Sequence, residues 1–277
     1  MKEKLRQIRH VALDMDGTIY QGSTLFEFTK PFLDSLAEMG IGHTFLTNNP
    51  SKSVKDYLAK LAQMGIEVDE PQLYTSTQST IEFLQQNYPP ARRIFALGTP
   101  SMCEEFEKFG FKICEDSPGD EPDAVVIAFD MTLTFSRLCR AAWWIRQGKP
   151  FIATNPDRVC PTDQPTVWVD CGSLCACLQA ATGRAPDAVL GKPHPSMLRG
   201  ILARHSLKPH ELAMVGDRTY TDMAMAHSAG ALGVLVLTGE TSLEEAQKYF
   251  PPPDLILPSI KELGAKLREA KKFAALG

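Results

Sequence analysis

The chain has 277 residues, of which 44% are hydrophobic and 22% are charged, and its formal net charge is −4. These values are ordinary for a globular protein of one large domain or two. They argue against a nucleic-acid polymer as partner, because such binding depends on a basic field. The first nine residues carry no apolar signal-peptide core, and no apolar run reaches the length that spans a membrane.

Short β-branched runs alternate with amphipathic helical patterns along the chain, which predicts an α/β fold with a mostly parallel sheet. The last predicted strand follows three prolines and is expected at a sheet edge. In chain order, strands are predicted at 11–13, 43–47, 94–97, 124–129, 151–154, 212–215, 233–237 and 254–257, and helices at 31–40, from 53, at 101–109, at 135–146 and from 260.

The stretch Asp14-Met15-Asp16-Gly17-Thr18 places two carboxylates one residue apart at the end of a predicted strand. Alternation along an extended chain points both side chains the same way, and a divalent cation relieves the repulsion between them. An ordinary turn is the alternative interpretation. An EF-hand calcium loop does not fit, because the glycine follows the second acid directly and no acidic ladder comes after it.

Three further segments follow predicted strands or begin helices, namely Thr47-Asn48-Asn49, Lys192 and the pair Asp217 and Asp222. Ligands of open α/β sheets bind beyond the carboxyl ends of the strands, so these groups are expected to converge. One carboxylate can attack phosphorus and another protonate the leaving oxygen, while a hydroxyl, amides and an ammonium hold the phosphoryl oxygens. The remaining carboxylate completes a Mg²⁺ site.

Each of these segments also has an ordinary explanation when taken alone. Thr47 to Pro50 reads as a turn, Lys192 as a surface lysine, and Asp217 as the cap of the helix that begins near Thr219. Their order and spacing together outweigh these alternatives, because the four pieces are largely independent.

The four segments match, in order, the motifs of the haloacid dehalogenase superfamily of phosphatases, which the chain resembles. The resemblance implies a doubly wound Rossmann-like core and Mg²⁺ as cofactor. It implies that Asp14 is the nucleophile and that Asp16 is the general acid and then the general base. The backbone carbonyl of Asp16 would also bind the metal. Thr47 and Lys192 would bind the phosphoryl group, Asp217 would be a metal ligand, and Asp222 would either support the metal ligands or be an alternative ligand.

The interval from Thr47 to Lys192 spans 145 residues, far more than a βαβ step needs, and predicts an inserted domain of about a hundred residues. We expect core segments at 1–79 and 185–277 and a smaller α/β cap domain at 80–184. Motifs such as Gly98-Thr99-Pro100-Ser101 resemble the NagD-like subfamily, whose members include nucleotide, sugar-phosphate, phosphoglycolate and pyridoxal-phosphate phosphatases.

The resemblance also implies that the cap loop from Asn155 to Pro161 faces the substrate, with Asp157 as a binding residue alongside Asn48 and Asn49. A plain Asn-Pro turn is the open alternative. Pyridoxal-phosphate phosphatases carry histidine where Cys160 stands, which argues against that substrate.

Two other groups of residues in the middle of the chain are given structural interpretations. Cys171, Cys175 and Cys177 lack a fourth zinc ligand and are expected to be buried thiols on a cap helix. Trp143 and Trp144 are assigned to the core or an interface. The odd number of cysteines without a secretion signal favours a reducing, cytoplasmic setting.

The sequence therefore predicts a Mg²⁺-dependent phosphatase that hydrolyses small phosphorylated metabolites through an aspartyl-phosphate. Two alternatives stay open: a phosphotransferase or phosphomutase with the same intermediate, and a non-catalytic protein that binds phosphometabolites. The physiological substrate is also open, and so is the choice between a monomer and a homodimer.

Overall fold

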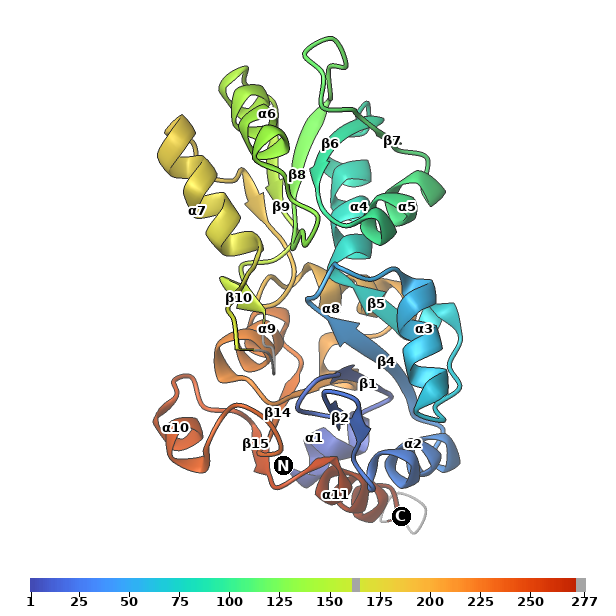
Figure 1. Ribbon diagram of the computed structural model, residues 1–277. Helices are drawn as coiled ribbons and strands as arrows, with labels where there is room; N and C mark the ends of the chain where they lie inside the picture. Colours follow the sequence, from blue (N-terminus) through green and yellow to red (C-terminus); the bar gives the residue numbers. More distant parts are fainter. Residues whose placement is uncertain (161–164, 273–277) are drawn as a thin grey trace. The chain divides into compact units, whose positions relative to one another are not determined.

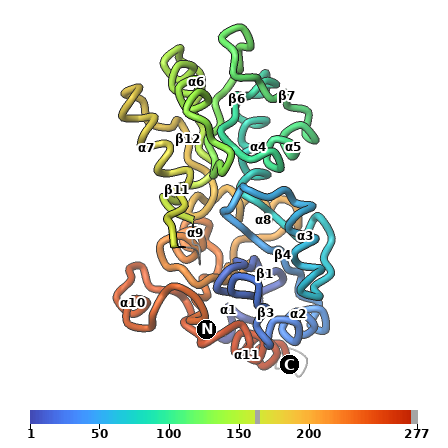
Figure 2. Tube along the Cα trace, in the orientation of Figure 1, coloured from blue at the N-terminus to red at the C-terminus, as the bar shows by residue number. Residues whose placement is uncertain are grey.

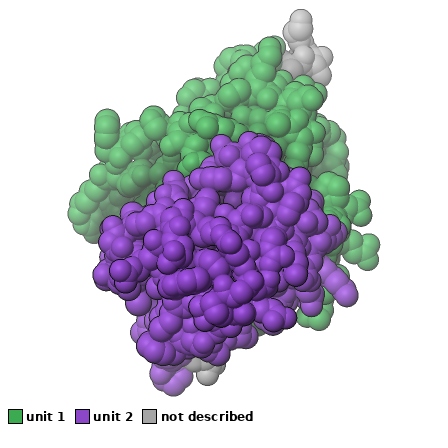
Figure 3. Space-filling model, turned by 90° about the horizontal axis from the view of Figure 1, so that it is seen from above, with its two compact units in different colours: residues 1–46, 58–74, 192–277 green, residues 47–57, 75–191 purple. Residues whose placement is uncertain are grey.

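The computed structural model describes residues 1–160 and 165–272 (Figure 1). The chain forms two compact units, one made of residues 1–46, 58–74 and 192–277 and the other of residues 47–57 and 75–191 (Figure 3). The segment 80–184, for which we expect a cap, lies wholly inside the second unit. Pro161 of the predicted cap loop lies outside the described residues.

The first unit is built on a six-stranded sheet in the order β15-β14-β13-β1-β4-β5, and its recorded pairings are parallel. β15 is at one edge, as predicted. The elements wholly or mainly in this unit are α1 (Lys2–Gln7), β1 (His10–Asp14), β2 (Tyr20–Gln21), β3 (Thr24–Leu25), α2 (Thr29–Glu38), β4 (Gly42–Thr47), α3 (Val54–Gln63), η1 (Glu70–Gln72), β5 (Leu73–Thr75), α8 (Ser196–Arg204), η2 (Pro209–Glu211), β13 (Leu212–Gly216), η3 (Thr219–Met223), α9 (Ala224–Ala229), β14 (Leu232–Val236), α10 (Leu243–Lys248), β15 (Leu255–Leu257) and α11 (Ile260–Lys272).

Helices cover this sheet in two groups. On one face, Ala12 of β1 and Met214 of β13 pack with Met197 and Ile201 of α8 and Met225 of α9. In the other group, α11 contacts both α1 and α2. The central strands β1, β13 and β14 are buried along their whole length, which is why they appear as largely apolar runs in the sequence.

The second unit is a smaller three-layer structure, built mainly from the middle of the chain (Figure 2). Its parallel sheet has the order β12-β9-β8-β6-β7, with α6 and α7 against one face and α4 and α5 against the other. A short antiparallel hairpin, β10–β11, adjoins it. The elements are α4 (Ser76–Asn87), β6 (Arg93–Leu97), α5 (Pro100–Lys108), β7 (Lys112–Ile113), β8 (Ala124–Ile127), α6 (Phe135–Arg146), β9 (Phe151–Ala153), β10 (Val159–Cys160), β11 (Trp168–Val169), α7 (Cys171–Thr182) and β12 (Ala188–Val189).

The alternating α/β architecture with parallel sheets is thus as predicted. Of the tryptophans assigned to the core or an interface, Trp144 is buried and Trp143 is 38% exposed. Cys171 and Cys175 are buried on α7, but the expectation for Cys177 is wrong, because the helix turns this residue to the surface. No helix in the described ranges combines the length and the apolar character needed to cross a membrane.

Candidate active site

The strand ends of the first unit bring two predicted acids to the same edge of the sheet. Asp14 is the last residue of β1, and Asp217 directly follows Gly216, the last residue of β13. The two strands are parallel neighbours in which Leu13 pairs with Val215. Both carboxylates therefore lie at the carboxyl edge, where open α/β sheets bind their ligands.

Lys192 lies between two of the acids. Its ammonium bonds the Asp14 carboxylate and lies 2.8 Å from Asp222 Oδ1. The lysine is 4% exposed and Asp222 is fully buried. Burial alone would lower the pKa of Lys192, but the charges of Asp14 and Asp222 outweigh it and raise that pKa, so the side chain stays a cation. Lys192 is therefore not a surface lysine.

Asp14, Asp217 and Asp222 form a compact group of buried carboxylates. One oxygen from each lies within 4.8 Å of the others. Burial first, and the charge of Asp14 next, raise the pKa of Asp217 to about 6. Burial also raises the pKa of Asp222 to about 7, although Lys192 opposes this shift. Asp217 and Asp222 thus lie in a poorly hydrated space, where the nearby carboxylate of Asp14 adds to the effect of burial.

Asp222 reaches this group from an unusual turn. It lies in η3, a π-helical turn, and its Oδ2 accepts a hydrogen bond of 3.1 Å from the Arg218 N–H. A Cβ at Gly216 would come within 2.3 Å of the Asp222 carboxyl group. A glycine at the end of β13 therefore makes room for this acid.

Asp217 is held by backbone from two distant segments. Its Oδ2 accepts a hydrogen bond of 2.7 Å from the Glu240 N–H, and a Cβ at Gly239 would come within 2.0 Å of this oxygen. A Cβ added at Gly17, which has a φ of +81°, would come within 2.5 Å of the same Asp217 oxygen. The Gly17 carbonyl accepts a hydrogen bond from Thr238 Oγ1. The segment 238–240 was not among the predicted site residues. Its one sequence signal is a Thr-Gly pair directly after a predicted strand.

The donor set fits a hard divalent cation. Oδ1 of Asp217 is buried and accepts no hydrogen bond from the described residues, although the other oxygen of the same carboxylate is anchored by Glu240. A buried carboxylate oxygen without a donor, in a group of three acids, is costly unless a cation binds it. Oxygen ligands of this kind are those that Mg²⁺ prefers.

Asp16 differs from this group in its exposure. It follows β1 at the surface, where a short bridge joins it to Tyr20. Partial burial of its carboxyl group, and then the charge of Asp14, raise its pKa, while the nearby ammonium of Lys60 opposes the shift. A carboxyl group with a raised pKa can hold a proton that an ordinary aspartate would lose.

The other predicted binding residues are brought together within the second unit. Asp157 Oδ2 accepts hydrogen bonds from Asn48 Nδ2, at 3.0 Å, and from Asn155 Nδ2, at 3.1 Å. Asn49 Nδ2 lies 3.7 Å from Cys160 Sγ. Asn155 is fully buried, whereas Val159 of the same loop is exposed. Two of the predicted binding residues, Asn48 and Asp157, are therefore direct partners.

Thr47 is the last residue of β4 and is nearly buried. Its hydroxyl accepts a hydrogen bond of 3.2 Å from the Asn49 N–H and lies 3.5 Å from the Tyr57 hydroxyl, which in turn donates to the Asn49 carbonyl. These bonds give the segment after β4 a defined turn.

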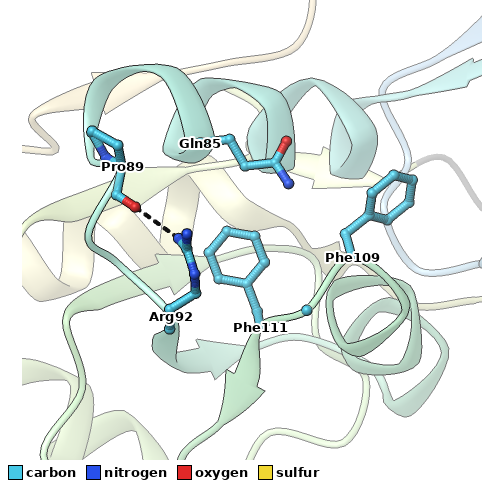
Figure 4. A pocket seen from close by; sticks show the side chains of 6 residues that line it. Gln85, Pro89, Arg92, Phe109 and Phe111 are labelled. Atoms are coloured by element: carbon cyan, nitrogen blue, oxygen red, sulfur yellow. Dashed lines mark hydrogen bonds between the residues drawn. The ribbon is translucent and has the colours of Figure 1, made fainter.

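The second unit also carries a hollow of about 290 Å³ between α4 and the end of α5 (Figure 4). Its lining combines two phenylalanine rings with the Arg92 guanidinium, which donates to the Pro89 carbonyl. None of the predicted site residues lines it; the lining residues are Gln85, Pro89, Arg92, Phe109, Gly110 and Phe111.

Comparison with protein families identifies two matching regions. A family described as haloacid dehalogenase-like hydrolase matches residues 11–112, and one described as HAD-hydrolase-like matches residues 189–263. The first match contains Asp14, Asp16 and Thr47, and the second contains Lys192, Asp217 and Asp222.

Similar individual proteins extend over nearly the whole chain. The ribonucleotide monophosphatase NagD of Escherichia coli is 30% identical over 92% of this chain and 98% of its own length. The crystal structure of a 4-nitrophenylphosphatase from Thermotoga maritima has a TM-score of 0.89 and 38% identity, covering 95% of this chain and 98% of that one. A glycerol phosphate phosphatase from Mycobacterium tuberculosis, solved with magnesium, has a TM-score of 0.85 and 31% identity, covering 94% of this chain and 77% of that one.

Proposed function

The chain belongs to the haloacid dehalogenase-like hydrolases and is a phosphatase of the NagD-like group, and we propose that it hydrolyses small phosphomonoesters through an aspartyl-phosphate on Asp14, with Mg²⁺ as cofactor. The observation that carries this proposal is the buried group of Asp14, Asp217 and Asp222 with Lys192 among them. A nucleophile, a cation site and a fixed positive charge are together what phosphoryl transfer requires.

The proposed reaction has two steps. A carboxylate oxygen of Asp14 attacks phosphorus, the bond from phosphorus to the ester oxygen breaks, and Asp16 donates its proton to that oxygen. Asp16, now a carboxylate, takes a proton from water as the water oxygen attacks phosphorus, which releases inorganic phosphate and restores Asp14. The raised pKa of Asp16 supports the first of these roles.

The remaining predicted residues have binding roles in this proposal. Lys192, whose raised pKa keeps it charged, and the hydroxyl of Thr47 bind the phosphoryl oxygens. Asn48, Asn49 and Asp157 contact the rest of the substrate. Such contacts act mainly by orienting the ester for attack in line with the leaving oxygen.

Mg²⁺ would be held by Asp14, Asp217 and the backbone carbonyl of Asp16. Asp222 lies within the same group of oxygens and either ligates the ion directly or holds its neighbours in place. When bound, the ion neutralises charge on the carboxylates and on the phosphoryl group. The magnesium complex of the similar glycerol phosphate phosphatase supports this choice of metal.

The proposed substrates are small metabolites with one phosphate ester, such as nucleotides, sugar phosphates or phosphoglycolate. The names of the similar proteins support this class, since they refer to ribonucleotide monophosphates, 4-nitrophenyl phosphate and glycerol phosphate. We also propose that the enzyme works in the cytoplasm, because all seven of its cysteines are free thiols.

The test is phosphate release with Mg²⁺ across nucleotides, sugar phosphates, phosphoglycolate and pyridoxal phosphate, ranked by kcat/KM. Asp14→Asn should fold normally and release essentially no phosphate, whereas Asp34→Asn, on the exposed surface of α2, should keep full activity. A chelator should abolish turnover, and added Mg²⁺ should restore it. Turnover by Asp14→Asn would disprove the nucleophile.

Product analysis separates hydrolysis from the two open alternatives. With an added alcohol such as glycerol, a phosphotransferase forms a new phosphate ester, whereas a phosphatase releases inorganic phosphate in a one-to-one ratio with the alcohol product. Binding of these compounds without any release would instead identify a non-catalytic protein.

A further inference from the structure

The N-terminal turn of α7 is bonded to the backbone of the loop that carries Asp157. The Gly172 N–H donates to the Asp157 carbonyl at 2.7 Å. The Arg158 carbonyl accepts two bonds, one of 3.0 Å from the Asp170 N–H and one of 2.7 Å from Ser173 Oγ. Three donors within residues 170–173 therefore hold two adjacent carbonyls, and the loop is attached to the start of the helix.

Side chains strengthen this attachment from inside. Asn155 Nδ2 donates both to Asp157 Oδ2, at 3.1 Å, and to Asp170 Oδ1, at 3.3 Å. Asn155 Oδ1 accepts a bond of 2.8 Å from Thr154 Oγ1. The NH2 group and the oxygen of the Asn155 amide thus both have hydrogen-bond partners. These bonds fix the positions of the two acids, Asp157 and Asp170.

Asp170 is the unexpected member of this network. It caps the first turn of α7 through the Cys171 N–H, yet it is only 3% exposed. Burial, with the charge of Asp157 adding to it, raises the pKa of Asp170 to about 6. An acid that served only as a helix cap could lie in solvent, where its charge is well hydrated.

Gly172 allows the close contact between the helix and the loop. A Cβ at this position would come within 2.2 Å of the Pro156 carbonyl oxygen and 3.0 Å of the Asp157 carbonyl oxygen. Both are backbone atoms, which cannot rotate aside as a side chain does. Any larger residue must therefore move the loop away from α7.

We propose that Asp170 and Gly172 are positioning residues for substrate binding, which act by fixing the loop 155–160 so that the Asp157 carboxylate meets the substrate in one orientation. This inference rests on the proposed function, in which Asp157 contacts the substrate. Both residues belong to the second unit, whereas the acids around Lys192 belong to the first, so we expect their substitution to change KM and leave the chemical step intact.

The experiment uses the full-length enzyme with Mg²⁺ and 4-nitrophenyl phosphate, followed by the best metabolite of the panel. Asp170→Ala should raise KM about fivefold, the effect of one lost buried hydrogen bond, and leave kcat within about twofold. Asp170→Asn keeps the oxygen that accepts from Asn155 and Cys171, and should restore KM. Ser173→Ala, a milder change, should raise KM less.

Thr134→Ala is the matched control. Thr134 caps α6, which has 12 residues like α7, but its hydroxyl accepts from Arg137 and has no bond to the loop 155–160. This variant should keep the wild-type KM. An unchanged KM in Asp170→Ala, or an equal rise in Thr134→Ala, would overturn the proposal.

Hydrogen exchange separates failure of this inference from failure of the proposed function. The amides of Asn155 and of residues 157–160 should exchange faster in Asp170→Ala than in wild type or Thr134→Ala. If wild type releases no phosphate, the proposed function fails, and the exchange data alone report on the attachment. If exchange is the same in all three proteins, α7 does not fix the loop, whatever the activity.

Discussion

Lys192 and Asp222 form a buried ion pair, with 2.8 Å between the ammonium nitrogen and Asp222 Oδ1. Their side chains are 5% and 0% exposed, so neither charge is relieved by water. Removing one member of a buried pair leaves the other charge without compensation, and that is more destabilising than loss of the whole pair.

Lys192→Met should therefore lower the free energy of unfolding by about 3–5 kcal/mol at neutral pH. The double variant Lys192→Met with Asp222→Asn should recover part of this loss, because no uncompensated acid remains at that position. Urea unfolding of wild type and of the variants measures both effects. A double variant less stable than Lys192→Met would contradict the pairing.

Gly239→Ala should weaken Mg²⁺ binding more than it weakens the fold. The new methyl group would meet the Asp217 carboxylate, and this side chain would rotate away from the other acids. The Mg²⁺ concentration for half-maximal activity should rise about tenfold or more, as it does when groups that orient a ligand are altered.

Gly119→Ala is the control for this substitution, because a Cβ there would meet only Ser117 Oγ at 3.8 Å. It should leave the Mg²⁺ requirement unchanged. Titration of activity with Mg²⁺, together with thermal unfolding, checks both variants. Wild-type Mg²⁺ dependence in Gly239→Ala would show that the contact with Asp217 does not matter for the metal.

His10 should make the protein less stable in mild acid. Burial first, and the charges of His205 and His43 next, lower the pKa of His10 to about 3, compared with 6.5 in an unfolded chain. Between these values the unfolded state binds the extra proton, so stability is full above pH 6.5 and falls as the pH decreases towards 3. At pH 5 the free energy of unfolding is lower by about 2 kcal/mol than at neutral pH.

His10→Gln removes this contribution. Between pH 7.5 and pH 5, its free energy of unfolding should fall by about 2 kcal/mol less than that of wild type. His227→Gln, at an exposed position, should keep the wild-type pH dependence. Urea unfolding at the two pH values supplies the comparison. An equal loss of unfolding free energy between the two pH values in wild type and His10→Gln would show that this histidine does not cause the pH dependence.

The cysteines should react at rates set by their burial. Cys139 and Cys177 are exposed, whereas Cys171 and Cys175 are buried, with their sulfur atoms 4.0 Å apart. Brief treatment with iodoacetamide at pH 8 should label the first pair and spare the second, since a buried thiol is neither accessible nor easily ionised. Peptide mass spectrometry identifies the labelled sites. Rapid labelling of Cys171 would contradict its packed position on α7.

Much of the sheet framework could be predicted because its strands are buried on both faces. Strands such as 124–127 and 212–216 appear as uninterrupted apolar runs, which are rare elsewhere in the chain. Helix α4 is not predicted from the sequence, because its buried face is largely polar. Its first turns bury polar residues, among them Ser76, Thr77 and Thr80, so no apolar periodicity marks it.

The positions of the acids and the lysine could be picked out because each lies close to the end of a strand or the start of a helix, and local pattern is enough to find such positions. The groups that hold these side chains in position could not be predicted. Glu240 donates to Asp217 from 23 residues away, and Asp170 accepts from Asn155 across 15 residues. Contacts of this kind depend on how the elements pack, which local pattern does not encode.

The contact of Gly17 and Thr238 joins the two ends of the chain at the reactive acids. During synthesis, Asp14 therefore leaves the ribosome more than two hundred residues before the backbone that orients Asp217 exists. For most of this interval Asp14, the proposed nucleophile, has neither Lys192 nor the acids Asp217 and Asp222 beside it. A chain without its last third thus carries Asp14 but lacks the other groups of the proposed reaction, and we expect activity only once that third has folded.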